Sequence, residues 1–224
     1  MVSIIIPVLN EEKVIEKFLM ELKGLKGEKE IILVDGGSTD NTALIASKYG
    51  KVVKSQKGRA FQMNVGAKVA TGEILWFLHC DSQIEKDSIC EIERAIKEGY
   101  NGGGFLLNFY DLHSGFMKFV SLTSNWRAKY FGLYYGDQGI FVKREVFKRL
   151  KGFKEIEIME DWDFSHKLKK LGKMKMINSS IGTSGRRFEQ GGQVKTLLLM
   201  HKIKILYMLG VSPSKLNKIY REAR

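Results

Sequence analysis

The chain has few cysteines and lacks any long apolar segment. Only Cys80 and Cys90 occur among its 224 residues, and such a pair is not the disulfide framework of a small secreted domain. No stretch approaches the roughly 20 uncharged apolar residues of a membrane-spanning helix. The N-terminus also lacks the basic and then apolar pattern of a secretory signal. We therefore expect reduced thiols and a cytoplasmic location.

Two nucleotide-binding motifs are also missing. The sequence contains neither a G-x-G-x-x-G fingerprint nor a P-loop, so a dehydrogenase or an NTPase is not expected. Acidic residues are scarce, with 25 Asp and Glu against 37 Lys and Arg and a net charge of +12. This excess suits nucleic acid, anionic lipid, a phosphate-bearing substrate or simple solubility. A nucleic-acid-binding module remains an alternative, although no recognised basic motif supports it.

Apolar segments that run into polar turns are the clearest positive signal. Residues 31–34 lead to Asp35 and Gly36, residues 2–7 lead to Asn10, and residues 74–78 lead to Asp81. Short apolar runs bounded by turn residues are typical of strands buried on both faces of a parallel sheet. Ligands of such sheets bind beyond the carboxyl ends of the strands. These strand ends therefore predict one shared ligand site.

The order of the predicted elements indicates an α/β fold. Strands over 2–7, 31–35, 52–53 and 73–78 alternate with helices over 12–25, from the caps at 38–40 to 49, 60–70 and 87–98, as in a doubly wound domain. Further along we expect strands at 105–109 and 140–142, and helices within 116–135, at 143–150 and at 161–171. With 44% apolar residues, residues 1–224 suit a single domain with one core.

The C-terminal tail, residues 191–224, is basic and apolar. Between residues 194 and 209, Lys195, Lys202 and Lys204 interrupt a run of Leu, Ile and Met. One interpretation places this helix in a membrane interface with its lysines at the headgroups. Another packs it as the closing helix of the core, and the two are compatible.

Several segments resemble the inverting nucleotide-sugar glycosyltransferases of family 2. They are SIIIPVLNEE at 3–12, EIILVDGGSTDNT at 30–42, GRAFQMNVGAKVATGEILWFLHCDS at 58–82, YGDQGIFVKREVF at 135–147 and MEDWDFSHKLKKLG at 159–172. They stand in the family's order, and the tail resembles small bacterial members that are little more than a catalytic domain. The resemblance implies a GT-A fold, a Rossmann-like three-layer α/β domain with a central, mostly parallel sheet.

The implied activity is transfer of a sugar from a nucleotide-sugar donor, expected to be a UDP-sugar, to a hydroxyl acceptor with inversion. The acceptor would be lipid-linked or a glycan. The tail would hold the protein on the anionic surface of the inner face of the membrane. A sugar-1-phosphate nucleotidyltransferase is the alternative enzyme. It is disfavoured because Pro7, Val8, Leu9 and Asn10 follow the first strand in place of a glycine-rich, Arg-bearing phosphate loop.

The resemblance assigns nucleotide binding to Pro7, Asn10, Glu12, Asp35, Lys57 and Arg59. Pro7 and Asn10 would cradle the nucleoside, and Asp35 would accept a hydrogen bond from a uracil N–H group. Glu12 is either a ribose contact or a first-turn acid favoured by the helix dipole. Lys57 and Arg59 would bring positive charge to the nucleotide, or only solvate the surface.

The metal site implied by the resemblance is incomplete. Asp81 matches the last acid of the family's DxD motif, but the motif here reads His79, Cys80, Asp81. Asp81 can suffice because Mg²⁺ and Mn²⁺ take much of their coordination shell from phosphates and water. If His79 is a ligand, its imidazole favours Mn²⁺; otherwise it is only a hydrogen-bond partner of the carboxylate.

The resemblance makes Asp161, next to Glu160, the general base, because inversion needs a carboxylate to take the acceptor's proton. Two further groups complete the implied site. Gly136, Asp137 and Gln138 would face the donor sugar or acceptor. Arg186 and Arg187 would help a divalent cation neutralise the leaving diphosphate.

Overall fold

The computed structural model describes residues 1–222. Its centre is an eight-stranded sheet with the order β3-β2-β1-β4-β7-β6-β8-β5. The strands are β1 Val2–Val8, β2 Lys29–Asp35, β3 Lys51–Lys54, β4 Ile74–Phe77, β5 Gln83–Ile84, β6 Gly102–Phe109, β7 Phe141–Lys143 and β8 Met174–Thr183. The first four strands are parallel, as are β6 and β8, whereas β7 is antiparallel to both its neighbours and β5 to β8.

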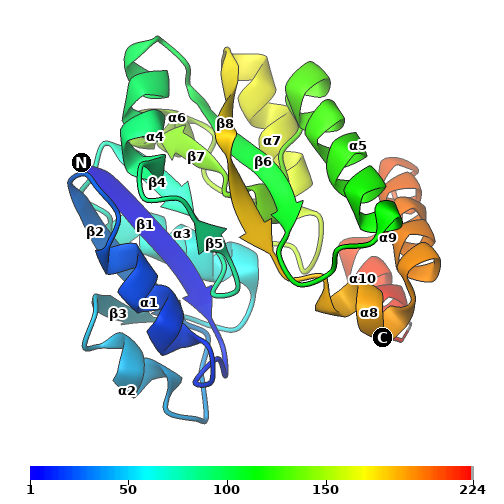
Figure 1. Ribbon diagram of the computed structural model, residues 1–224, viewed down its shortest axis with the longest axis horizontal. Coiled ribbons are helices and arrows are strands. Elements are labelled where there is room, and N and C mark those ends of the chain that lie inside the picture. Colours follow the sequence, from blue (N-terminus) through cyan, green and yellow to red (C-terminus); the bar gives the residue numbers. More distant parts are fainter. Residues whose placement is uncertain (223–224) are drawn as a thin grey trace.

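Helices cover both faces of this sheet (Figure 1). They are α1 Ile15–Lys23, α2 Thr42–Ala46, α3 Arg59–Val69, α4 Ser88–Lys97, α5 Gly115–Phe131, α6 Arg144–Arg149, α7 Glu160–Leu171, α8 Arg186–Gly191, α9 Gln193–Met208 and α10 Pro213–Glu222. Alternate residues of each central strand enter opposite cores, since Ile4 and Ile6 pack with α1 and α4 whereas Ile5 packs with α3. This period of two is the pattern of a strand buried on both faces.

The sequence predicted most of these elements, with some errors. The first helix begins at Ile15 and not at residue 12, and the second ends at Ala46, three residues before the predicted end. Sequence reasoning missed β5, β8 and α8, whereas α9 and α10 lie within the tail that was predicted to be helical. Most of the ten residues of β8 are partly exposed, and only Ile177, Ile181 and Gly182 are buried. The strand also includes a β-bulge opposite β6, so it does not form the apolar run that marked the other strands.

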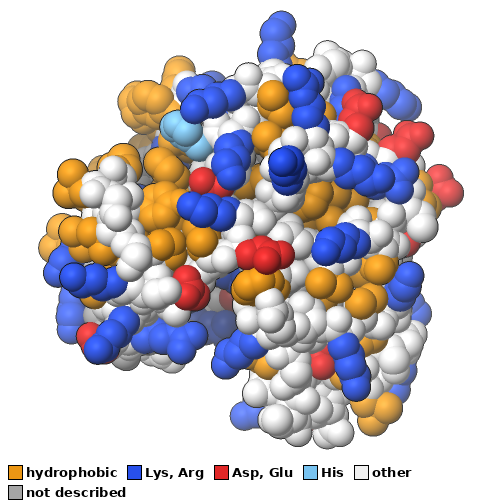
Figure 2. Space-filling view, turned by 180° about the vertical axis from the view of Figure 1, so that it is seen from behind, with side chains coloured by type: hydrophobic (Ala, Val, Ile, Leu, Met, Phe, Trp, Pro, Cys, Tyr) orange, Lys and Arg blue, Asp and Glu red, His pale blue; other side chains and the backbone are white. Residues whose placement is uncertain are grey.

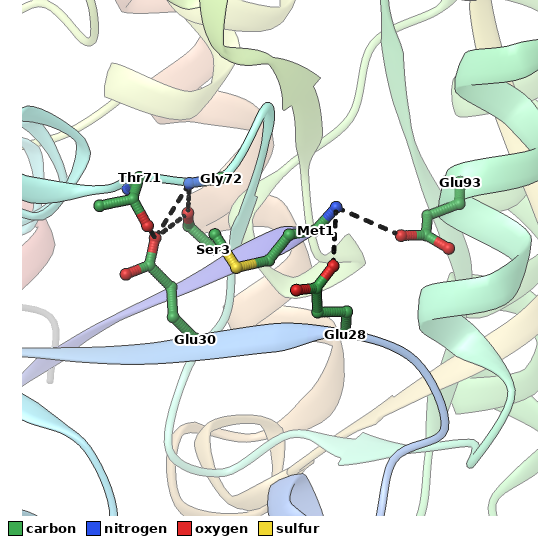
Figure 3. A network of polar contacts seen from close by, with 7 residues as sticks. All are labelled: Met1, Ser3, Glu28, Glu30, Thr71, Gly72 and Glu93. Carbon is green, nitrogen blue, oxygen red and sulfur yellow. Dashed lines mark hydrogen bonds and ion pairs between the residues drawn. The ribbon is translucent and has the colours of Figure 1, made fainter.

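A polar network closes the sheet at the edge opposite the predicted site (Figure 3). Glu30 accepts hydrogen bonds from Ser3 Oγ at 2.5 Å, from Thr71 N at 2.6 Å and from Gly72 N at 3.0 Å. Burial alone would raise the pKa of Glu30, but these hydrogen bonds outweigh it and the pKa lies below its ordinary value. The network therefore ties β1 and β2 to the turn before β4.

The lowered pKa of Glu30 makes stability depend on pH. Its contribution is present above the ordinary pKa of 4.5 and is lost as the pH falls through the lower value of the folded protein.

We expect Glu30→Gln to reduce the unfolding free energy by about 1 kcal/mol at pH 7, after a discount for solvent exposure. This loss should shrink towards pH 3. Urea unfolding across this range tests it, with Glu28→Gln as control because Glu28 is exposed and has only a 4.0 Å ion pair with the N-terminus. A loss that does not change with pH would contradict the account.

Candidate functional site

The loops after β1 and β2 are tied to each other at the carboxyl edge of the sheet. Asn10, at a positive φ of 56°, accepts a hydrogen bond from Thr39 N at 2.9 Å and donates its own N–H to Ser38 Oγ at 3.0 Å. Asp35 is buried, and its Oδ1 accepts from Ser38 N and Oγ. The register pairs Val8 with Asp35, so two of the predicted strand ends do meet. Asn10 and Asp35 therefore belong to one hydrogen-bonded pair of loops.

Three further residues that were predicted to bind the nucleotide differ in their exposure and contacts. Pro7 is half-buried within β1, opposite Val34. The Glu12 carboxylate accepts hydrogen bonds from Asn41 N at 3.1 Å and Nδ2 at 3.3 Å. Because Glu12 precedes α1, whose first-turn acid is Glu16, the first-turn interpretation is wrong, and Glu12 instead ties its loop to the N-terminus of α2. Lys57 is exposed in the turn before α3.

Sequence reasoning missed Gln62. This side chain is buried, and its Nε2 donates to Val8 O at 2.9 Å and to Val34 O at 2.7 Å. It therefore clamps the ends of β1 and β2 from α3. A polar residue among the small buried residues of α3 is the sequence signal that could have revealed it.

Asp161, His79 and Gly136 meet at the other end of the site. Asp161 Oδ2 accepts a hydrogen bond from Gly136 N at 2.8 Å. A Cβ atom at position 136 would lie 2.7 Å from His79 Nε2 and 3.6 Å from Asp161 Oδ2, so the absence of a side chain there lets the two functional groups approach. Burial first, and then the charge of Arg59, lower the pKa of His79 to about 4. The imidazole is therefore neutral at physiological pH.

Glu160 forms an ion pair with Arg59. The distance from Arg59 Nε to Glu160 Oε1 is 3.0 Å, and the Glu160 side chain is buried whereas Arg59 is half-exposed. Burial raises the pKa of Glu160, and Arg59 opposes that rise. The second oxygen, Oε2, has no hydrogen-bond partner among the described residues. Arg59, which was predicted to bind the nucleotide, thus holds Glu160 beside Asp161.

The turn that follows α5 contributes one buried carboxylate oxygen without a described partner and one enclosed amide. Asp137 Oδ1 is buried and has no hydrogen-bond partner within the described chain, and burial raises the pKa of this carboxyl group. The prediction that Gln138 faces the sugar is wrong, because Gln138 is fully buried. Its Oε1 accepts from Arg127 Nη2 at 2.7 Å and its Nε2 donates to Phe105 O at 3.2 Å. Gln138 therefore supports the turn from below.

Asp81 lies beside the loop that precedes the tail. Arg186 Nη2 lies 3.5 Å from Asp81 Oδ2 in a partly exposed ion pair. Arg187 lies over the ring of Tyr220, with 5.0 Å from its Cζ atom to the ring centroid. The next residue to Asp81, Cys80, is buried, which raises the pKa of its thiol. Arg186 is therefore the tail-loop arginine that meets the third predicted strand end.

Comparison with known proteins decides the family. The family model described as Glycosyl transferase family 2 matches residues 3–150, which include Asn10, Asp35 and Asp81. The chain belongs to glycosyltransferase family 2. Membership leaves the nucleotidyltransferase and the nucleic-acid-binding module without support.

Two proteins with sequences similar to that of this glycosyltransferase are named as transferases. A PGL/p-HBAD biosynthesis glycosyltransferase of Mycobacterium bovis is 29% identical over 182 residues, which cover 74% of this chain and 68% of the relative. An undecaprenyl-phosphate 4-deoxy-4-formamido-L-arabinose transferase of Proteus mirabilis is 29% identical over 113 residues, which cover 45% and 35%.

Solved structures establish the fold of the glycosyltransferase as GT-A. The mannosyltransferase PcManGT of Pyrobaculum calidifontis, in complex with GDP-Man and Mn²⁺, superposes with a TM-score of 0.70 at 19% identity, covering 99% of this chain and 68% of that one. The 1–349 fragment of Staphylococcus aureus TarS with UDP-GlcNAc gives a TM-score of 0.61 at 21% identity, covering 80% of this chain but only 58% of that fragment. At this identity the likeness concerns the fold alone.

The tail of the glycosyltransferase packs against its body and reaches the site. Ile203 of α9 is buried in a cluster with Ile158, Met159 and Leu216. Lys204 is half-buried, with its Nζ 4.9 Å from the centroid of the Tyr135 ring, whose other cationic neighbour is Arg127 at 3.7 Å. Burial and then the charge of Arg127 lower the pKa of Lys204 to about 8. Lys204 therefore does not extend outward as a headgroup lysine would.

The ion pair of the glycosyltransferase between α3 and α7 yields a second prediction. Arg59→Met leaves the buried Glu160 carboxylate unpaired, so we expect a loss of about 1–2 kcal/mol of unfolding free energy, discounted from the buried-pair value because Arg59 is half-exposed. In the double variant Arg59→Met/Glu160→Gln, most of this loss should be recovered. Chemical unfolding of the single and double variants measures the coupling. Additive losses would show that the pair is not coupled.

Proposed function

We propose that this protein transfers a sugar from a nucleotide-sugar, in the first instance a UDP-sugar, to a hydroxyl acceptor with inversion at the anomeric carbon. The observation that carries the proposal is the position of Asp161. Its carboxylate is fixed by the Gly136 N–H, away from the loops that carry Asn10 and Asp35. A base on one side of the site and a nucleoside contact on the other fit a direct displacement of the nucleoside diphosphate at the anomeric carbon.

In this reaction Asp161 takes the proton of the acceptor hydroxyl. The acceptor oxygen bonds to the anomeric carbon while the bond from that carbon to the diphosphate oxygen breaks, so the nucleoside diphosphate leaves from the opposite face. The Arg59 pair holds Glu160 in place beside the base. Gly136 lines a small cavity together with His79 and Asp161, where a sugar hydroxyl would lie. The adjacent Asp137 has a buried Oδ1 with no hydrogen-bond partner among the described residues.

On the donor side, Asp35 accepts a hydrogen bond from the uracil ring, and Pro7 and Asn10 contact the nucleoside. Glu12 holds the neighbouring loop through Asn41, while Lys57 supplies positive charge from the surface. Arg186, with Arg187 behind it, lies near the negative charge that develops on the diphosphate.

A divalent cation, Mn²⁺ or Mg²⁺, is part of the proposal. Within residues 1–222 no group of three or more His, Cys, Asp or Glu side chains is arranged to hold a metal ion. The donor set available is the Asp81 carboxylate with the neutral imidazole of His79, which fits an ion that completes its shell from phosphates and water. Bound there, the ion would neutralise charge on the diphosphate.

The acceptor is proposed to be lipid-linked or a glycan. The Proteus relative is named for undecaprenyl phosphate, which supports a lipid carrier and hence a peripheral position on the cytoplasmic face of a membrane. We further propose that residues 1–224 act as one catalytic domain, in which α9 and α10 of the tail close the acceptor side.

A nucleotide-release assay tests the proposal. The protein is incubated with Mn²⁺ and, in turn, UDP-, GDP-, dTDP- and CMP-linked sugars, and the free nucleotide formed by slow donor hydrolysis is measured. We expect release from one donor class, UDP-sugars first, at a rate that depends on Asp161. Release from none of them, with a mixed lipid-linked acceptor pool present, would contradict the proposal.

A further inference from the structure

The outer face of α5 carries an apolar stripe that nothing in the described chain covers. Phe119, Leu122, Trp126 and Tyr130 recur every three or four residues and therefore share one side of the helix. Each is more than half exposed, with Leu122 at 68% and Trp126 at 56%. Within residues 1–222, the aromatic rings that contact Trp126 are themselves exposed. The distance between ring centroids is 5.3 Å to Tyr130 and 5.4 Å to Phe131. A soluble monomer rarely leaves such a stripe in water.

Helix α9 repeats the arrangement. Val194, Leu198, Ile205 and Met208 are exposed along it, whereas Ile203 and Thr196 on its other side are buried. The helix is thus anchored by one face and presents a second apolar stripe to the solvent.

The two helices are neighbours. Met117 and Val120 of α5 share a cluster with Leu197 and Met200 of α9, and Ser114, which caps α5, donates to Gln193 Oε1 at 2.9 Å. Figure 1 shows α5 and α9 at the same end of the molecule, and in Figure 2 orange side chains gather over this region with blue ones among them. We call this region the α5–α9 face.

The charge of the α5–α9 face is of one sign. The two helices contain Lys and Arg and no Asp or Glu; these cations are Lys118, Arg127, Lys129, Lys195, Lys202 and Lys204. Arg127 and Lys204 are turned to Tyr135, whereas the other four are exposed. An isologous contact with a second copy would bring these like charges together, so charge disfavours a dimer here and favours an anionic partner.

We propose that the α5–α9 face docks onto an anionic lipid bilayer. Its aromatic and aliphatic stripes would lie at the boundary between headgroups and acyl chains, and the four exposed lysines would contact the headgroups. Residues 1–222 contain no helix with the length and apolar character of a membrane span. The face includes α5, which the sequence did not associate with a membrane.

The position of the face connects it to the reaction, and here the inference rests on the proposed function. Arg127 of α5 and Lys204 of α9 both contact Tyr135, and the next residue, Gly136, donates to Asp161. A lipid-linked hydroxyl arriving from a docked bilayer would thus approach the base along the side that these helices border.

Vesicle co-sedimentation of the full chain tests the inference. The probes are vesicles of phosphatidylcholine alone and of phosphatidylcholine with phosphatidylglycerol. We expect binding to the anionic vesicles, at least tenfold weaker binding to neutral ones, and a similar loss in 0.5 M salt. The variant Leu122→Ser/Trp126→Ser changes only exposed side chains and should lose at least tenfold in affinity. Lys118→Glu/Lys129→Glu should do the same. Leu44→Ser on α2, equally exposed at 66%, should bind as the wild type does.

Three results would overturn the inference: no binding of the wild type to anionic vesicles, equal binding by the α5 variants, or a dimer in solution that the α5 variants abolish. The donor-hydrolysis assay in the absence of lipid keeps the two proposals apart. Hydrolysis without vesicle binding would remove only the docking surface, whereas vesicle binding without hydrolysis of any nucleotide-sugar would remove the proposed function.

Discussion

Asp161→Asn is expected to lower sugar transfer by about 10³-fold or more, the upper part of the range for a general base. Asparagine keeps the shape of the side chain and can still accept the Gly136 hydrogen bond, but it cannot take a proton from the acceptor. Nucleotide affinity should stay within a factor of about three, because Asn10 and Asp35, the proposed nucleoside contacts, lie on other loops. Initial rates with saturating donor, together with calorimetric binding of the nucleotide, measure the two effects.

The same helix supplies the control. Asp163→Asn changes an acid two residues away, which forms an ion pair with Lys167 at 2.7 Å, and should leave the transfer rate within a factor of about two. If Asp161→Asn retained more than a tenth of the wild-type rate, another residue would be the base. Glu160→Gln would then be the next variant, because Glu160 is the adjacent buried acid with an unpaired oxygen.

Asp81→Ala is expected to weaken Mn²⁺-supported nucleotide binding by about 100-fold, the scale on which loss of a metal-supporting group acts. Asp81 is the carboxylate available where β4 ends, and the first acid of the family's motif is replaced by His79. No described cluster offers a substitute ligand set. Calorimetry of UDP binding at several Mn²⁺ concentrations measures the loss, which should be small when the metal is absent.

Arg186 provides a further comparison for this prediction, because it shares the ion pair with Asp81. Arg186→Met should weaken nucleotide binding both with and without Mn²⁺, since it removes a positive charge that does not depend on the metal. Asp87→Ala, an exposed acid that pairs with Lys26, should change neither. Unaltered Mn²⁺ dependence in Asp81→Ala would assign the cation to other groups.

The sequence predicted those parts of the protein that depend on local pattern. The central strands appear as short apolar runs because both of their faces are buried, and the strand ends at Asn10 and Asp35 follow from the same topology. By contrast, β8 is half-exposed and bulged, so its residues carry no run that a local reading could detect.

The missing parts of the site depend on contacts between distant residues. Arg59 and Glu160 are about a hundred positions apart in sequence, and only the packing of α3 against α7 makes them a pair. In the same way, Lys204 contacts Tyr135 because α9 folds back on the body. The composition of the tail shows a basic apolar helix but not which of its lysines faces inward. Gln138 shows the opposite error, in which a residue was predicted to face the ligand but is not available to it. Its side chain is hydrogen-bonded to Arg127 and to the backbone carbonyl of Phe105.

Calorimetric titration of UDP into the unmodified protein, with and without Mn²⁺, tests the central claim most directly. The claim is that the loops at Asn10 and Asp35, together with Asp81, form the site of a nucleoside diphosphate donor. The account predicts saturable binding at one site that is markedly tighter when Mn²⁺ is present. Absence of binding for UDP, and likewise for GDP and dTDP, under both conditions would contradict it.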